Sequence, residues 1–232
     1  MVCMRAYMAR CSIDMGELIT IALAWLAYGA LHSFAASHRV KGWMARWYPS
    51  LLPAYRLAYN LIAAVLLLPP LALTWRFRGP VLWDVPAAME WAGALLAVAG
   101  FAVSLRWYDG ATFLGLRQWQ RRVGPDDERE AFTLSPLHRH VRHPWYALGL
   151  LFLWTRDMNA AWLVTAASLT LYLVVGSRLE ENKLIALYGE AYRRYRRQVP
   201  AFLPWPGRSL SRRKAKALEA LARLEAERNR PG

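Results

Sequence analysis

Uncharged apolar runs alternate with basic, aromatic stretches along the chain, and the lengths of the runs predict membrane-spanning helices. A helix needs about 20 mainly apolar residues to cross a bilayer core. Three runs reach or approach this length, at residues 18–36, 57–75 and 89–105. Small residues in the third run would let another helix approach closely. We therefore expect three transmembrane helices in the first half of the chain.

Two further apolar runs, 145–154 and 160–175, flank the polar segment 155–159. The first run is too short to cross a bilayer untilted. We interpret the pair as a helical hairpin whose tip lies inside or near the far interface. The predicted fold class is an all-α integral membrane helical bundle with about five transmembrane segments. The last two segments form the hairpin, and cytoplasmic C-terminal helices follow it.

Composition supports this class and excludes others. Of 232 residues, 56% are hydrophobic, which excludes a disordered chain, and two cysteines are too few for a disulfide scaffold. The net charge is +14, and when the predicted loops are assigned to alternate sides, 25 Lys and Arg fall on one side against 5 on the other. The positive-inside rule then predicts an external N-terminus and a cytoplasmic C-terminus. We expect the membrane to be a bacterial inner membrane. Charge distributed in this way indicates contact with membrane lipids and gives no support for a nucleic-acid partner.

The chain is predicted to hold a single membrane domain at 1–206 and a separate tail at 207–232. The tail places four leucines near one face of a basic helix, at positions 210, 218, 221 and 224. This pattern predicts a basic amphipathic helix that lies on the membrane or in solvent. We expect no chemistry in the tail.

Charged side chains gather at the open end of the predicted hairpin. Arg142 and His143 precede its first arm, and Glu180 and Glu181 end its second arm. Carboxylates near a helix C-terminus oppose the helix dipole, so a cation is expected beside them. The two pairs are therefore predicted to meet, although pairing with a basic neighbour on the same helix remains open.

This order of motifs resembles the C-terminal half of isoprenylcysteine carboxyl methyltransferases and their bacterial relatives. The matching segments are VRHPWYALG, LEENKL and GEAYRRYRRQVPAFLP. Upstream, the chain is similar to the branch that contains nurim and methanethiol S-methyltransferase, through LHSFAAS, PAYRLAYN, FLGLRQW and LWTRDMN. The resemblance covers roughly residues 28–206.

The resemblance implies an integral membrane methyltransferase that uses S-adenosylmethionine, with its cofactor region at 138–206. The positions that match the family's cofactor motif are Arg142, His143, Pro144, Tyr146, Glu180 and Glu181. We expect the basic pair to bind the cofactor carboxylate and a glutamate to bind its amine or a ribose hydroxyl. Tyrosines 146, 188 and 192 are expected to pack on the adenine or near the sulfonium, which adds Tyr188 and Tyr192 to the predicted cofactor-binding residues.

The acceptor is expected to be a small or lipid-soluble molecule, with a thiol favoured over a carboxylate or a lipid amine. A thiol reacts as the thiolate, and a nearby cation favours that form. Arg117, in FLGLRQW, and His32, in the first span, are therefore the predicted catalytic residues.

Two other functions stay open at this point. One is a non-catalytic, nurim-like membrane protein. The other is a haem-binding membrane protein that uses His32 and one of His138, His140 or His143 as axial ligands. No metal site is predicted, because the spacing of the three later histidines lacks an acidic or cysteine partner nearby.

Overall fold

The computed structural model describes residues 14–123 and 132–228, and these residues are predominantly helical. Within them, four helices are long and apolar enough to cross a membrane: α2 (Met15–Ala35), α4 (Tyr55–Arg76), α5 (Ala87–Ser104) and α9 (Ala160–Gln198). The predicted fourth span is the shorter helix α8 (Pro144–Trp154). The prediction of an all-α integral membrane protein is confirmed. The N-terminal residues that the charge count places outside lie beyond the described part.

Shorter elements connect these helices. The helical ones are α3 (His38–Trp47), α6 (Gly110–Leu114), α7 (Leu116–Arg121), α10 (Arg212–Arg228) and 3-10 turns at Pro49–Ala54, Leu105–Trp107 and Leu137–Arg139. Two short strands, β1 (Val81–Trp83) and β2 (Met158–Asn159), pair in antiparallel fashion. The sequence pattern did not predict this ribbon. Pairing of the strands satisfies backbone groups at the tip of the α8–α9 connection, where an open backbone would be costly near lipid.

The chain divides into two compact units. Unit 1 consists of the described parts of Met1–Trp91, Tyr108–Glu128 and Trp154–Thr170. Unit 2 consists of the described parts of Ala92–Trp107, Arg129–Leu153 and Leu171–Gly232. The single domain predicted at 1–206 stays a prediction.

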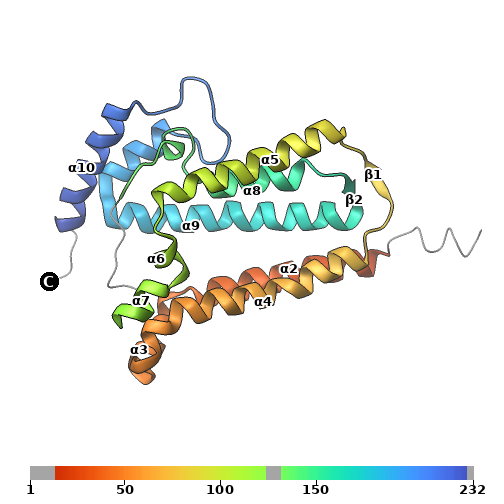
Figure 1. Ribbon diagram of the computed structural model, residues 1–232, viewed down its shortest axis with the longest axis horizontal. Coiled ribbons are helices and arrows are strands. Elements are labelled where there is room, and N and C mark those ends of the chain that lie inside the picture. The colour runs from red at the N-terminus through yellow and green to blue at the C-terminus, as the bar shows by residue number, and fades with distance from the viewer. Residues whose placement is uncertain (1–13, 124–131, 229–232) are drawn as a thin grey trace, which may run out of the picture. The chain divides into compact units, whose positions relative to one another are not determined.

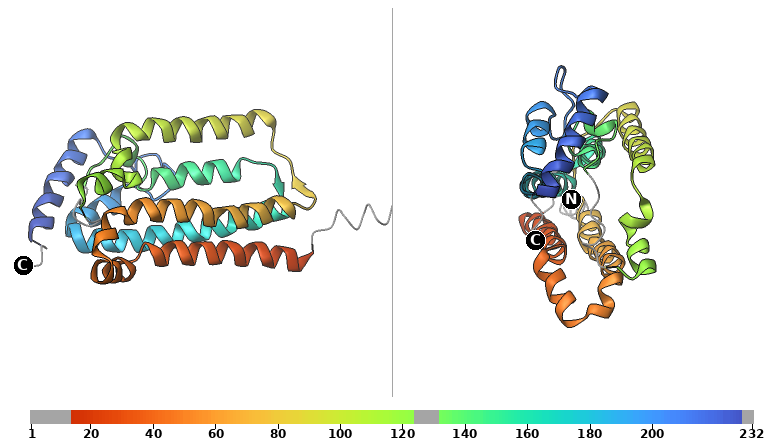
Figure 2. Two further views of the ribbon diagram at one scale, coloured as in Figure 1. Left: turned by 60° about the horizontal axis from the view of Figure 1, so that its bottom comes forward. Right: turned by 90° about the vertical axis from the view of Figure 1, so that its left-hand side faces the viewer.

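In unit 1, α2 and α4 run side by side, as Figure 2 shows. Ile21 and Trp25 of α2 are buried against Ala161 at the start of α9. The indole Nε1 of Trp25 donates a hydrogen bond of 3.0 Å to the hydroxyl of Thr165, and that hydroxyl lies 2.7 Å from the hydroxyl of Thr74. These polar groups satisfy one another between helices whose other faces are apolar, which helps to hold the helices together.

In unit 2, α10 packs against the C-terminal part of α9 (Figure 1). The buried side chains of this core are Leu134, Tyr188, Ala191, Tyr192, Tyr195, Val199, Leu210, Ala215, Leu218 and Ala222. The predicted basic amphipathic helix is therefore present, and its apolar face is covered by protein. Most of the charged residues of α10 are exposed, but Glu219 and Glu225 are half-buried, and Glu219 accepts a hydrogen bond of 2.7 Å from the backbone N–H of Leu134.

A kink divides α9 at Gly189, whose backbone has φ +49° and ψ −126°. This left-handed conformation favours glycine. A Cβ at this position would also collide with the carboxylate of Glu225 on α10. The kink therefore requires glycine at position 189, and an added Cβ would also displace the flexible side chain of Glu225.

Gly189→Ala is expected to lower the free energy of unfolding by about 1–3 kcal/mol, through backbone strain and the collision with Glu225. Gly176→Ala in the same helix is the control, because a Cβ there meets no atom within 4 Å. Thermal unfolding followed by circular dichroism in detergent measures both. Equal midpoints for the two variants would contradict the proposed requirement for glycine.

Candidate functional site

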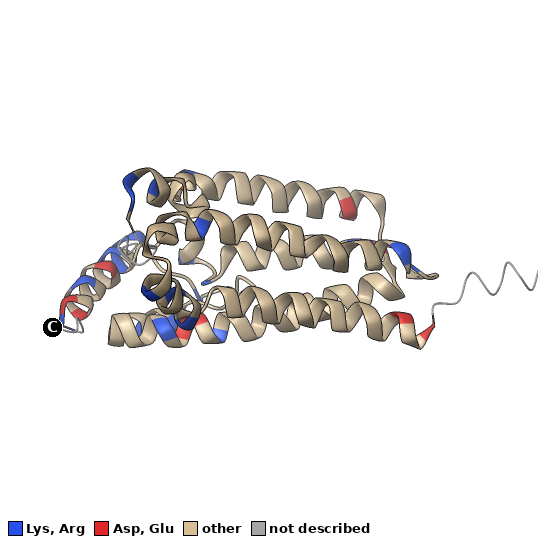
Figure 3. Ribbon diagram, turned by 90° about the horizontal axis from the view of Figure 1, so that it is seen from below, with Lys and Arg blue, Asp and Glu red and all other residues tan. Residues whose placement is uncertain are grey.

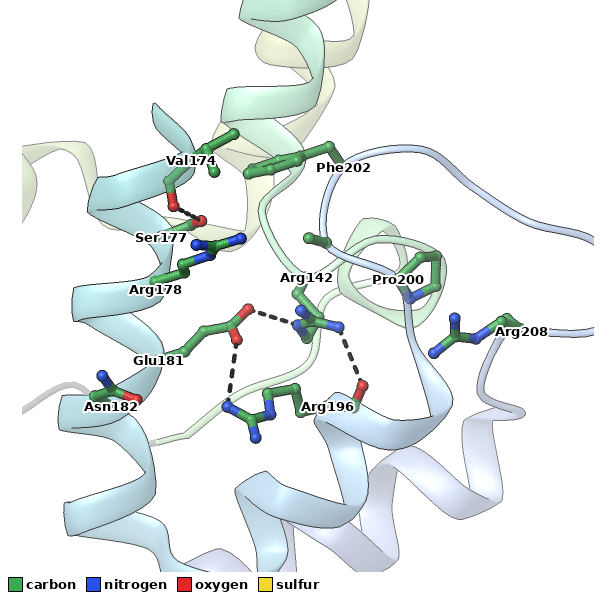
Figure 4. Close-up of a pocket in the computed structure, with 11 residues that line it drawn as sticks. Arg142, Val174, Ser177, Arg178, Glu181, Asn182, Arg196, Pro200, Phe202 and Arg208 are labelled. Atoms are coloured by element: carbon green, nitrogen blue, oxygen red, sulfur yellow. Dashed lines mark hydrogen bonds and ion pairs between the residues drawn. The ribbon is translucent and has the colours of Figure 1, made fainter. Parts of the chain in front are cut away.

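The candidate site in unit 2 is built around the carboxylate of Glu181, a residue of α9 that is only 5% exposed. Arg142 donates to it from Nε at 2.7 Å, and Nε2 of His143 lies 3.1 Å from the same oxygen. Figure 4 shows Arg142 and Glu181 pointing toward one another. A buried carboxylate is costly unless cations and hydrogen bonds compensate it, and these two residues do so. The predicted meeting of the basic pair with the glutamates is confirmed.

Arg142 also ties the end of α9 to the start of α8. Its backbone N–H donates to the carbonyl of Pro200 at 2.9 Å. Its Nη1 donates to the carbonyls of Arg196, at 3.1 Å, and of Val199. The last carbonyls of a helix have no partner within the helix, and the guanidinium supplies one here. Arg142 therefore binds both Glu181 and the end of α9.

The ring of His143 contacts two aromatic side chains and both glutamates. It stacks on Tyr146, one turn later, with centroids 5.2 Å apart and planes 8° from parallel. Phe202 lies on the loop after α9, with its centroid 5.8 Å from that of His143. Glu180 accepts a hydrogen bond from the hydroxyl of Tyr146 at 3.3 Å, and the same oxygen lies 3.6 Å from Nδ1 of His143. Both glutamates thus contact the same histidine.

A cavity of about 670 Å³ opens beside this cluster. It is lined by Arg142, Val174, Ser177, Arg178, Glu181, Asn182, Arg196, Pro200, Ala201, Phe202 and Arg208. The volume lies in the range of small-molecule sites. Four guanidinium groups and a single carboxylate line it, together with the ring of Phe202 (Figure 4). The cavity is therefore suited to a ligand with an anionic group, a hydrogen-bond donor and a flat apolar part.

The structure places the predicted cofactor residues at different depths around this cavity. Arg142 and Glu181 line it. His143 contacts Glu181 behind the lining, whereas Pro144 begins α8. Tyr146 and Glu180 are joined by a hydrogen bond beside His143.

Tyr188 and Tyr192 lie elsewhere in unit 2. Both are buried in the core between α9 and α10, where the ring of Phe132 lies 5.1 Å from Tyr188 and 6.0 Å from Tyr192. Neither lines the cavity. Their contact with a cofactor stays a prediction.

Several lining residues were missed in the sequence. Arg178 precedes Glu181 by three positions, so helical spacing alone places both on one face and could have identified it. Phe202 lies in the AFLP segment that carries part of the family resemblance. Arg196 lies in the same matching segment, near the end of α9. Arg208 had no such signal, because only the return of the chain after α9 brings it to the cavity.

Arg117, the first predicted catalytic residue, lies in unit 1 on α7. Its Nε is 2.6 Å from Oδ2 of Asp109. Partial burial raises the pKa of Asp109. Hydrogen bonds from Thr112 and Ala111 and the charge of Arg117 lower it by more, so the pKa of Asp109 is below its usual value. Gly115, with φ +90°, joins α6 to α7 and sits so close to α4 that a Cβ would lie 2.6 Å from a backbone nitrogen there. The loop is therefore held firmly, with Arg117 already paired to an acid.

His32, the second predicted catalytic residue, lies in unit 1 near the end of α2. The hydroxyl of Tyr59 is 2.7 Å from its Nε2, and the two ring centroids are 5.1 Å apart. The centroid of the Tyr28 ring lies 5.6 Å from that of His32. His32 is thus held by two tyrosines, and its catalytic role stays a prediction.

His138 supports the site from the preceding 3-10 turn. Its Nδ1 lies 2.8 Å from the hydroxyl of Ser135, and its carbonyl accepts a hydrogen bond from Tyr195 at 2.7 Å. Burial, and then the positive charge of His143, lower the pKa of His138 from 6.5 to about 4. Across residues 14–123 and 132–228, no three His, Cys, Asp or Glu side chains form a group that could hold a metal ion.

The low pKa of His138 predicts how stability varies with pH. Between pH 6.5 and about 4 the unfolded chain binds a proton at this residue and the folded chain does not. The free energy of unfolding should therefore fall as the pH is lowered through this window, by about 3 kcal/mol at most. His138→Gln should flatten the pH dependence of the thermal midpoint in detergent, whereas His140→Gln, at an exposed position, should not. Parallel profiles for the wild type and His138→Gln would contradict this.

The fold defines a helical integral membrane protein, and the cavity in unit 2 is its candidate small-molecule site. Comparison with known proteins identifies the family. Methanethiol S-methyltransferase of Mycobacterium tuberculosis is 34% identical over 203 residues, which span 83% of this chain and 81% of the relative. Methanethiol S-methyltransferase of Crocosphaera subtropica is 32% identical over 211 residues, which span 84% of this chain and 75% of the relative. The chain belongs to the methanethiol S-methyltransferase family, and it is an integral membrane methyltransferase.

Nurim of Sus scrofa is a more distant relative, 29% identical over 202 residues that span 77% of this chain and 74% of nurim. Neither a family model nor a solved structure matches the chain. The predicted membrane methyltransferase branch, with nurim inside it, is confirmed.

Proposed function

We propose that the chain is an S-adenosylmethionine-dependent S-methyltransferase for a small thiol, with the methyl donor bound in the cavity of unit 2. Relatives named methanethiol S-methyltransferase support the thiol as acceptor. The observation that carries the donor site is the buried carboxylate of Glu181, held by Arg142 at the wall of a cavity that other arginines surround.

The residues present fit this donor. S-Adenosylmethionine has a carboxylate, an amine, ribose hydroxyls, a flat adenine and a sulfonium, and when bound it supplies an electrophilic methyl group. Arg178, Arg196 or Arg208 would hold the carboxylate through charge-assisted hydrogen bonds. Glu181 would accept a hydrogen bond from the amine or a ribose hydroxyl through Oε2, which lies 4.0 Å from Nη1 of Arg196, since Arg142 already donates to Oε1. Phe202 offers a ring face to the adenine.

In this proposal Arg142 and His143 are positioning residues. Their side chains bind Glu181 from within the protein, so they orient its carboxylate before a ligand arrives. Such orientation in advance reduces the cost of arranging the site when ligand binds. The residues first expected to bind the donor directly would thus act through Glu181.

The acceptor needs a different environment. A free thiol has a pKa of about 8.5, so it needs a positive neighbour to reach the thiolate form near neutral pH. Arg117 and His32 are the proposed acceptor-side residues. The asymmetry of 25 against 5 basic residues supports a cytoplasmic C-terminus and an inner-membrane location, which would give the donor access from the cytoplasm.

Glu181→Gln is expected to weaken binding of S-adenosylhomocysteine about 10- to 100-fold, because a neutral amide replaces the charged acceptor in the cavity. Isothermal titration of the detergent-solubilised chain measures this. Glu227→Gln removes the same charge at an exposed position of α10 and should bind as the wild type does. Unchanged affinity in Glu181→Gln would overturn the donor site.

The function itself is tested by transfer of a labelled methyl group to methanethiol, ethanethiol, a prenylcysteine and phosphatidylethanolamine. We expect turnover with the small thiols. In Arg117→Gln, we expect about a tenfold or larger rise in the thiol KM with unchanged affinity for S-adenosylhomocysteine, because the thiolate loses a nearby cation. Binding of S-adenosylhomocysteine without transfer to any acceptor would favour the non-catalytic, nurim-like alternative.

A further inference from the structure

A second cavity in unit 2, of about 600 Å³, lies where the end of α9 meets the loop to α10 and the first turns of α10. Its lining consists of Arg194, Arg197, Gln198, Gly207, Arg208, Ser209, Lys214, Ala217 and Leu218. Apart from Arg208, none of these residues lines the cavity proposed for the methyl donor. Ligand binding in this second cavity is independent of the proposed enzymatic function.

The charge of this second cavity is strongly positive. Four cations line it, and among the described residues the one carboxylate paired with them is that of Glu190. Arg194 lies 3.3 Å and Arg197 lies 2.7 Å from the same oxygen of Glu190. A single acid is thus shared by two arginines, while Arg208 and Lys214 add two further charges. Like charges this close repel one another, and an anionic ligand would relieve the repulsion.

The cations converge because separate elements are fixed against one another. Arg194 and Arg197 lie one turn apart on α9, and Arg208 reaches back to donate to the carbonyl of Arg197 at 3.0 Å. Lys214 lies in the first turn of α10, whose start also carries the positive end of the helix dipole. The burial of Leu218 against α9 holds that turn in place.

We propose that this cavity binds a phosphate group, either in the headgroup of an anionic membrane lipid or as free phosphate. Arginine forks match the oxygens of phosphate, and several cations at one point suit its multiple charged acceptors. The cavity is formed by a basic helix and by the end of the membrane helix α9 that the charge count predicts to face the cytoplasm. Basic clusters in such positions bind the headgroups of anionic lipids. Figure 3 shows Lys and Arg residues along α10.

The test is native mass spectrometry of the full chain in detergent, titrated with phosphatidylglycerol, phosphatidylcholine or inorganic phosphate. The variant Arg194→Gln/Lys214→Gln removes two cations that line the cavity. The matched control, Arg213→Gln/Lys216→Gln, removes two exposed cations of α10 that do not line it. Thermal midpoints show whether each variant is folded, and the single variant Lys214→Gln at an exposed position serves if the double variant is not.

We expect the wild type to retain phosphatidylglycerol in preference to phosphatidylcholine. The cavity variant should lose at least about tenfold in affinity and the control should stay within about twofold. Binding of inorganic phosphate that displaces the lipid and is lost in the same variant would support the site with free phosphate as its source. Equal losses in the two double variants would show only diffuse attraction and would overturn the proposal. Equal retention of the two lipids, without phosphate binding, would also overturn it.

Discussion

The arrangement of unit 2 depends on one buried carboxylate, that of Glu181. An ionised group with 5% exposure costs several kcal/mol unless cations and hydrogen bonds compensate it. Arg142 and His143 supply that compensation, and Arg142 in turn binds the carbonyls that end α9. One ion cluster therefore joins the start of α8, the middle of α9 and the loop after it. The cavity wall exists because these three segments are held together.

The arginines that line the cavity differ in how closely the protein holds them. Arg142 binds Glu181 and the carbonyls at the end of α9, whereas Nη1 of Arg196 lies 4.0 Å from Oε2 of Glu181 and Arg208 donates to the carbonyl of Arg197. A site whose acidic group is already oriented has less to reorganise when it binds a charged ligand. The loop between α9 and α10 contributes to both cavities through Arg208. The basic tail, expected to carry no chemistry, is in this way continuous with the structure around the site.

Membership of the methanethiol S-methyltransferase family agrees with a cavity that Glu181 and several arginines line. The fold alone does not determine chemistry, since nurim shares much of the same chain. What distinguishes a catalyst is the site, and in unit 2 the candidate site is the cluster around Glu181. Arg117 and His32 belong to unit 1, where Asp109 and Tyr59 hold them in defined positions.

The sequence by itself determined the long apolar helices, the family and the meeting of Arg142 with Glu181. Hydrophobic run length and charge are local properties, and a buried acid at a helix end needs a cation wherever the chain supplies one. Only the tertiary structure decided that α10 covers the tyrosines of α9, which places Tyr188 in a core rather than at the cavity. It also brought Arg196 and Phe202 to the site. These outcomes depend on how the chain returns after the kink at Gly189, and packing between distant segments leaves no periodic pattern in a sequence.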